Sequence, residues 1–109
     1  MLDKGTYLSS DAWNPNPWAG IHTYTSGVAF TVSANMYAKV IVARLRTGNA
    51  TITLSGNTDN AIVSLSGGTI NNYVSKSAAV SLTVTNADYI VATSQSNSVG
   101  PATMTITDN

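Results

Sequence analysis

The stretch VSLTVTNADYIVAT, residues 80–93, decides the fold of this chain. Apolar Val80, Leu82 and Val84 alternate with hydroxyl side chains, the period-two pattern of a strand that has one face in a core. The Asn-Ala-Asp sequence that follows is a turn signal, and a second apolar run comes directly after it. Two alternating apolar runs joined by a short polar turn indicate consecutive strands, and therefore an all-β domain.

The same alternation recurs on both sides of this stretch and predicts about eight strands with turn signals at short intervals. These strands cover residues 28–33, 37–46, 51–54, 61–66, 69–74, 80–85, 89–93 and 103–107, and residues 5–8 form a short first strand. No helix of three turns can be placed. We therefore expect one domain over residues 1–109, an antiparallel β-sandwich of the jelly-roll kind, with an immunoglobulin-like sandwich as the alternative.

The middle of the longest predicted strand is apolar on both faces. Val40, Ile41, Val42 and Ala43 follow one another without a polar residue. A strand that is covered on one face alternates, whereas a strand covered on both faces reads as a continuous apolar run. The sequence therefore predicts a central strand with cover on each side.

The composition excludes several classes of function. Lys and Arg number five, Asp numbers five, Glu is absent, and charged residues make up 9% of the chain. So few cations cannot neutralise many phosphates, so nucleic-acid binding is not expected. Hydrophobic residues make up 43% of the chain, which argues against disorder. Ser, Thr and Asn together account for 39 of the 109 residues and predict a neutral, hydrogen-bonding surface.

The chain has no Cys, so disulfides, thiolate metal sites and Cys nucleophiles are excluded. The first 20 residues carry no signal-peptide core, and no apolar run approaches the roughly 20 residues of a membrane-spanning helix. We therefore expect a protein made without a secretory leader, or else a processed or cloned fragment, and we expect no contact with a membrane.

Catalytic and metal-binding patterns are weak. A Ser-His-Asp triad would have to use His22, the single His of the chain, and no spacing points to it. Each Asp lies beside a turn or a terminus, where Asp serves local hydrogen bonding. Calcium ligation by Asp59 and Asp88 would supply too few carboxylates for an ordinary site. We expect no enzyme activity, no metal and no cofactor.

The most informative segment is a loop or arm over residues 9–20, which carries both Trp residues and two prolines. Trp13 and Trp18 either plug one end of the sandwich, anchor a partner subunit, or form a stacking platform for a sugar. Asn14 and Tyr24 are candidate companions in partner or glycan binding. The prolines lower the entropy cost of displaying the rings.

Two arginines form a second candidate contact. Arg44 and Arg46 fall on one face at the end of the predicted 37–46 strand, and Lys39 falls on the opposite face. They are either a solvated strand end or part of an interface, where paired hydrogen bonds favour Arg.

The chain resembles the small β-sandwich accessory proteins of tailed bacteriophage particles, namely capsid decoration proteins, head fibres and tail attachment modules. The resemblance rests on the short Met-start chain, the alternation of Thr and Ser with Val and Ile, the scarcity of charge, the absence of Cys and the Gly-Asn turns. Residues 81–92 are also similar to strand–turn–strand segments in jelly-roll modules of fibres and carbohydrate-binding domains.

This resemblance implies a non-enzymatic structural protein of the virion, assembled in the host cytoplasm and acting by protein–protein docking. It also implies partners among the major capsid, tail or fibre proteins and a homo-oligomer such as a trimer. The alternative function is a carbohydrate-binding module or an adhesin domain that binds a glycan outside the cell.

Overall fold

The computed structural model describes residues 2–10, 18–33, 37–96 and 100–109, with only the backbone of Trp18 and Ala19. These residues form strands and turns, and no helix capable of crossing a membrane occurs among them. The described residues form ten strands: β1 (Thr6–Ser10), β2 (Trp18–Thr23), β3 (Phe30–Val32), β4 (Ala38–Arg44), β5 (Ala50–Ser55), β6 (Asp59–Ser66), β7 (Thr69–Lys76), β8 (Val80–Val84), β9 (Tyr89–Gln95) and β10 (Ala102–Asp108).

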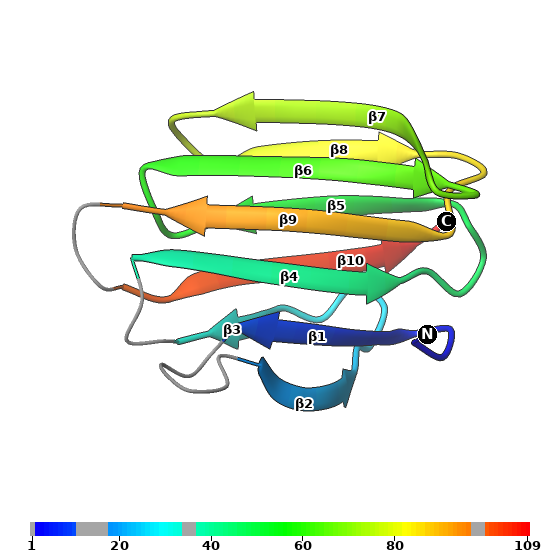
Figure 1. Cartoon of the computed structure of the whole chain (residues 1–109), viewed down its shortest axis with the longest axis horizontal. Coiled ribbons are helices and arrows are strands. Elements are labelled where there is room, and N and C mark those ends of the chain that lie inside the picture. Colours follow the sequence, from blue (N-terminus) through cyan, green and yellow to red (C-terminus); the bar gives the residue numbers. More distant parts are fainter. Residues whose placement is uncertain (1, 11–17, 34–36, 97–99) are drawn as a thin grey trace.

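The strands form two sheets that pack face to face (Figure 1). The six-stranded sheet has the order β2-β1-β4-β9-β6-β7, and the four-stranded sheet behind it has the order β3-β10-β5-β8. All neighbours within each sheet are antiparallel. The fold is therefore an antiparallel β-sandwich, as the sequence predicts.

The pairing of the last eight strands is nested. Strand β6 pairs with β7, β5 with β8, β4 with β9, and β3 with β10. This pattern arises when a long antiparallel ribbon of paired strands rolls up so that successive pairs fall into opposite sheets. It is the connectivity of a jelly roll. Strand β1 corresponds to the short first strand predicted over residues 5–8, and β2, which was not predicted, extends the six-stranded sheet beyond it.

Inward-facing side chains, which alternate with outward-facing ones along each strand, form the core between the sheets. From the six-stranded sheet, Ile41, Ile62 and Ile90 point inward and have no exposed surface, and from the four-stranded sheet Ile52 and Met104 meet them. The ring of Tyr7 stacks on that of Phe30 with 4.1 Å between their centroids, and this contact joins the two sheets at the β1 edge. These side chains alternate with outward residues, so each strand contributes one face to the core.

The segment predicted as an arm over 9–20 is shorter than expected. Ser9 and Ser10 belong to β1, and Trp18 to Gly20 belong to β2. The two strands pair through Leu8 and Ile21, and the register then shifts before Ser10 meets Trp18. A β-bulge accommodates this shift in register, so the two strands pair close to the prolines, where the sequence predicted no regular pairing.

One end of the core is closed by polar side chains. The Ser94 hydroxyl donates to Oδ1 of Asn60 at 2.6 Å, and the Asn57 amide donates to Ser94 at 2.9 Å. Lys39 has no exposed surface, and burial lowers the pKa of its ammonium below 10.5. Lys39 lies on the opposite face of β4 from Arg44, as predicted, but that face is the core, not solvent.

A cluster of Tyr24, Arg46 and Asp108 ties three separate segments together. The Tyr24 hydroxyl donates to Oδ1 of Asp108 at 2.8 Å and accepts from the Arg46 backbone N–H at 3.1 Å. The Arg46 guanidinium lies 4.2 Å from the centre of the Tyr24 ring, donates to the Tyr24 carbonyl, and forms an ion pair of 3.1 Å with Asp108. The segment after β2, the end of β4 and the end of β10 are thereby fixed to one another.

We predict that Tyr24→Phe flattens the alkaline stability profile. Burial of the ring, and next the hydrogen bond to and charge of Asp108, raise the pKa of Tyr24 from 10.0 to about 12. Between these values the unfolded chain releases the proton and the folded chain keeps it, so stability present below pH 10 is lost as pH rises towards 12. Tyr24→Phe removes this dependence and lowers stability at neutral pH by ~1–3 kcal/mol, because it leaves Asp108 and the Arg46 N–H without their partner.

Urea unfolding of the native protein and the variant across this pH range measures the effect. Tyr37→Phe is the control, because Tyr37 is 62% exposed and lies outside this cluster. Equal pH slopes for the native protein and Tyr24→Phe would contradict the assignment.

Candidate functional site

The outer face of the six-stranded sheet carries a row of apolar side chains that crosses all six strands. Register places Val63 opposite Tyr73 and Val91, Val42 opposite Val91 and Leu8, and Leu8 opposite Ile21. Each strand therefore contributes one apolar residue to what we call the outer row. The outer row consists of Ile21 (β2), Leu8 (β1), Val42 (β4), Val91 (β9), Val63 (β6) and Tyr73 (β7).

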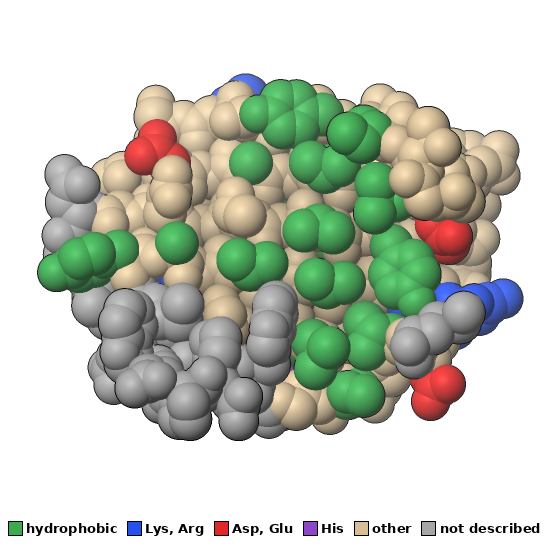
Figure 2. All heavy atoms as spheres, viewed as in Figure 1, with side chains coloured by type: hydrophobic (Ala, Val, Ile, Leu, Met, Phe, Trp, Pro, Cys, Tyr) green, Lys and Arg blue, Asp and Glu red, His purple; other side chains and the backbone are tan. Residues whose placement is uncertain are grey.

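The ends of the outer row are open and its middle is half-buried. Ile21 and Tyr73 are each 63% exposed, whereas Leu8, Val42, Val63 and Val91 are shielded in part by their neighbours on the same face. Figure 2 shows a broad band of hydrophobic side chains across this face of the molecule. A contiguous apolar patch on a sheet face is typical of a surface that contacts another protein.

A second line of side chains runs beside the outer row. Leu65 lies opposite Ile70 on one side and Tyr89 on the other, and Tyr89 lies opposite Arg44. The Arg44 guanidinium sits 5.9 Å from the centre of the Tyr89 ring and donates to the Leu2 carbonyl at 2.9 Å. Apolar and aromatic groups thus widen the band, and Arg44 marks its boundary at the end of the sheet.

The sequence signalled this face without locating it. The apolar run Val40–Ala43 predicted cover on both faces of its strand. The structure covers the inner face of β4 with the second sheet and leaves the outer face of Val42 without a covering layer among the described residues. The alignment of all six residues depends on strand order and register, which periodicity does not reveal.

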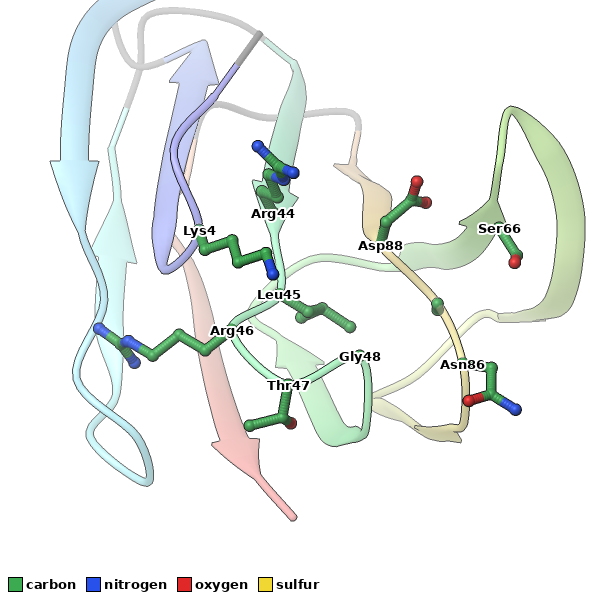
Figure 3. A pocket seen from close by; sticks show the side chains of 10 residues that line it. Lys4, Arg44, Leu45, Arg46, Thr47, Gly48, Ser66, Asn86 and Asp88 are labelled. Carbon is green, nitrogen blue, oxygen red and sulfur yellow. The ribbon is translucent and has the colours of Figure 1, made fainter.

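A shallow depression lies at the end of the sandwich where the β4–β5 and β8–β9 turns meet, with a volume of about 320 Å³ (Figure 3). Its lining comes from four separate parts of the chain. The lining residues are Lys4, Arg44, Leu45, Arg46, Thr47, Gly48, Ser66, Asn86, Ala87 and Asp88.

Backbone contacts hold the depression together. The Leu45 N–H donates to the Asp88 carbonyl, and the Ala87 N–H donates to the Gly48 carbonyl, each at 2.9 Å. Gly48 has a φ of +78°, and a Cβ there would come within 3.2 Å of the Ala87 carbonyl oxygen. Glycine is required because the two turns approach this closely in a left-handed conformation.

The charges in the depression do not all pair with one another. Oδ1 of Asp88 is buried and receives no hydrogen bond from any described residue. Lys4 is exposed and extends towards Leu45, whereas the Arg46 side chain points away from the depression towards its partner Asp108 (Figure 3). A buried carboxylate oxygen without a donor is costly to the folded state.

The residues expected from sequence to bind a partner or a glycan do not form one site. Trp13 and Asn14 lie outside the described residues, and Trp18 is placed only by its backbone in β2. Tyr24 is 1% exposed, and its hydroxyl is committed to Asp108 and Arg46, so its expected binding role is corrected to a structural one.

The two arginines have different roles. Arg44 lies beside Tyr89 at the edge of the apolar band, and Arg46 stabilises the contact between Tyr24 and Asp108. The ring of His22 stacks on Tyr7 with centroids 5.3 Å apart, and no hydrogen bond joins it to a Ser or Asp of the described chain. No group of three or more metal-ligating His, Asp or Glu side chains occurs among the residues that the structure places.

No family model and no curated protein matches the sequence. Among solved structures, the chain is similar to chitosan-binding module 1 of a chitosanase/glucanase from Paenibacillus sp. IK-5, with a TM-score of 0.45 and 15% identity. The similarity covers 75% of this chain and 77% of the module.

We predict that adjacent residues of β9 differ sharply in their contribution to stability. Ile90→Ala opens a cavity between the sheets and lowers the free energy of unfolding by ~2–5 kcal/mol, whereas Val91→Ala on the outer face lowers it by less than ~1.5 kcal/mol. Urea unfolding at low protein concentration measures both. Equal losses would show that Val91 lies in a closed core and would contradict its assignment to a surface.

Proposed function

We propose that this chain is a non-catalytic binding module that docks through the outer face of its six-stranded sheet onto the same face of a second copy. The outer row carries the proposal, because six aligned apolar residues cross the whole sheet. They are medium-sized, mostly branched side chains of the kind that interdigitate when one sheet packs on another.

Charge and size favour a second copy as the occupant. A contact with two-fold symmetry places a surface patch of one copy against the same patch of the second copy. A patch with charge of one sign would therefore repel its counterpart, whereas a neutral patch would not. None of the six residues of the outer row is charged. The molecule measures 35 × 27 Å across this face. The face is therefore large enough to supply the ~800 Å² that each partner contributes to a standard interface.

The proposal gives a dimer rather than the trimer that the sequence resemblance implies. A flat face that contacts its own copy closes the assembly at two chains, because no equivalent face is left for a third. Packing at the usual distance of about 10 Å between sheets buries the central valines.

We predict that the protein sediments with twice its mass of 11.3 kDa and that Val91→Lys or Val63→Lys returns it to the monomer. Either substitution places a charge at the centre of the interface, where desolvation costs several kcal/mol. Sedimentation velocity measures the mass, and circular dichroism confirms that the variants fold. Ser81→Lys is the matched control, since it adds the same charge at an exposed position of β8 in the other sheet. A native monomer, or a dimer that survives both valine variants, would contradict the proposal.

We also propose, from the sequence resemblance to bacteriophage accessory proteins, that the dimer is a component of a virion. Mass spectrometry of purified particles from the source of the sequence is expected to detect the chain in constant ratio to the major capsid or tail protein. Its absence from intact particles would contradict this role and leave the dimer proposal standing.

A second candidate function is carbohydrate binding in the depression at the end of the sandwich. The observation that favours it is the combination of hydrogen-bond donors and acceptors in the lining, with Asn86, Ser66 and Thr47 beside the charged groups. Sugars are recognised by such convergent polar groups in a concave surface. The two candidates use different parts of the molecule and can be tested separately.

A further inference from the structure

The outer face of the four-stranded sheet, which lies behind the six-stranded sheet in Figure 1, carries hydroxyl side chains at every outward position. Strand β10 presents Thr103, Thr105 and Thr107, and β3, β5 and β8 likewise present only Thr or Ser on this face. These residues alternate with buried ones such as Ile52 and Met104, which point into the core. We call the outward residues of these four strands the hydroxyl array.

Strand register arranges the hydroxyl array in ranks that cross the sheet. Two ranks are Thr105–Thr53–Ser81 and Thr107–Thr51–Thr83, and a third passes through Thr103. Neighbouring strands in a sheet lie about 4.8 Å apart, and successive outward residues of one strand lie about 6.8 Å apart. The face is therefore a two-dimensional lattice of hydroxyl and methyl groups with two fixed repeat distances.

The hydroxyl array is open to solvent and conformationally stiff. Thr53, Ser81 and Thr107 are exposed, and the two sheets account for all the described strands, so no further described strand covers this face. Thr is β-branched and has restricted χ1 rotamers. A hydrogen bond of 3.1 Å between the hydroxyls of Thr51 and Thr83 links β5 to β8. Few side-chain rotamers are therefore lost when this face contacts a rigid surface.

The chemistry of the hydroxyl array does not suit the usual kinds of partner. None of its residues is charged, so it offers nothing to an ionic ligand. It also lacks the large apolar side chains that form the centre of a protein interface. Side chains on a sheet face project roughly perpendicular to it, so they do not converge on a small ligand as in a concave site. A regular neutral lattice instead matches a partner that is itself a regular lattice of hydrogen-bonding groups.

We propose that the hydroxyl array binds the surface of ice crystals. The oxygen atoms on a prism face of ice repeat in two directions at distances close to those between the ranks and between the strands. Each Thr or Ser hydroxyl both donates and accepts a hydrogen bond, as a water molecule does. The Thr methyl groups occupy the spaces between hydroxyls and exclude disordered water from the contact.

This activity is independent of the docking proposed for the other sheet. A dimer that forms through the outer row leaves the two hydroxyl arrays on its opposite outer surfaces, because each array lies on the far side of its own sandwich. Ice binding and dimer formation therefore use different faces, and a substitution in one face leaves the other intact.

Strand twist limits how far the lattices match. Adjacent strands rotate by about 20–25° relative to one another, so a flat crystal face meets only a few strands at a time. The contact area is small. We therefore expect the protein to inhibit the recrystallisation of ice and to shape growing crystals, with only a modest separation between the melting and freezing temperatures.

The growth of ice in solutions of the full chain tests the proposal. Nanolitre osmometry measures the separation between the melting and freezing temperatures, and microscopy of annealed frozen films measures the growth of crystal grains. We expect the native protein to separate the two temperatures and to keep the grains small. An inert protein at the same concentration, such as serum albumin, is expected to do neither.

Thr53→Lys and Ser81→Lys are both expected to abolish or strongly reduce these effects, because a long charged side chain holds the array away from the crystal. Thr53 and Ser81 are exposed, so the variants are expected to fold, which circular dichroism checks. Thr69→Lys is the matched control, since it makes the same substitution at an exposed position of β7 in the other sheet. Val91→Lys, which disrupts the proposed dimer, is expected to retain the effects on ice.

Any of three results would overturn the proposal. The first is a native protein that affects ice growth no more than the inert protein does. The second is full activity in folded Thr53→Lys and Ser81→Lys. The third is an equal loss in Thr69→Lys, which would show that the added charge rather than the hydroxyl array decides the outcome. None of these results bears on the dimer.

Discussion

The contact between the inner faces of the two sheets constrains everything else in this molecule. Ile41, Ile62 and Ile90 have no exposed surface, and a slip of one residue in any of their strands would turn that strand's apolar set towards solvent. The inner contact therefore fixes the register of β4, β6 and β9. The same register aligns Val42, Val63 and Val91 on the outer face, so the proposed docking surface is a geometric consequence of the core.

The chain has few charged residues, and most of them have a specific structural position. Arg46 and Asp108 stabilise the ends of strands through Tyr24, and Lys39 is buried in the core beside β9. Lys4, Arg44 and Asp88 line the depression at one end of the sandwich. A neutral sheet face and a charged depression suit two different kinds of contact, the first with protein and the second with a small polar ligand.

Much of the fold follows from local pattern. Period-two alternation located the strands from Thr51 to Thr107 to within a few residues, and the number of short strands with turn signals between them favoured a sandwich. The arm was the main error, because pairing of β1 with β2 depends on a bulge that local pattern does not show. Tyr24 was misjudged for a similar reason: its partners, Arg46 and Asp108, are 22 and 84 residues away along the chain.

By itself, the sequence determined an all-β sandwich with a neutral surface, because side-chain alternation and composition are local properties that each strand carries alone. It also indicated, through the apolar run Val40–Ala43, that one strand needed cover on both faces. Only the tertiary structure decided which residues stand together. The outer row and the depression join residues that are distant along the chain, and strand order and register alone bring them together.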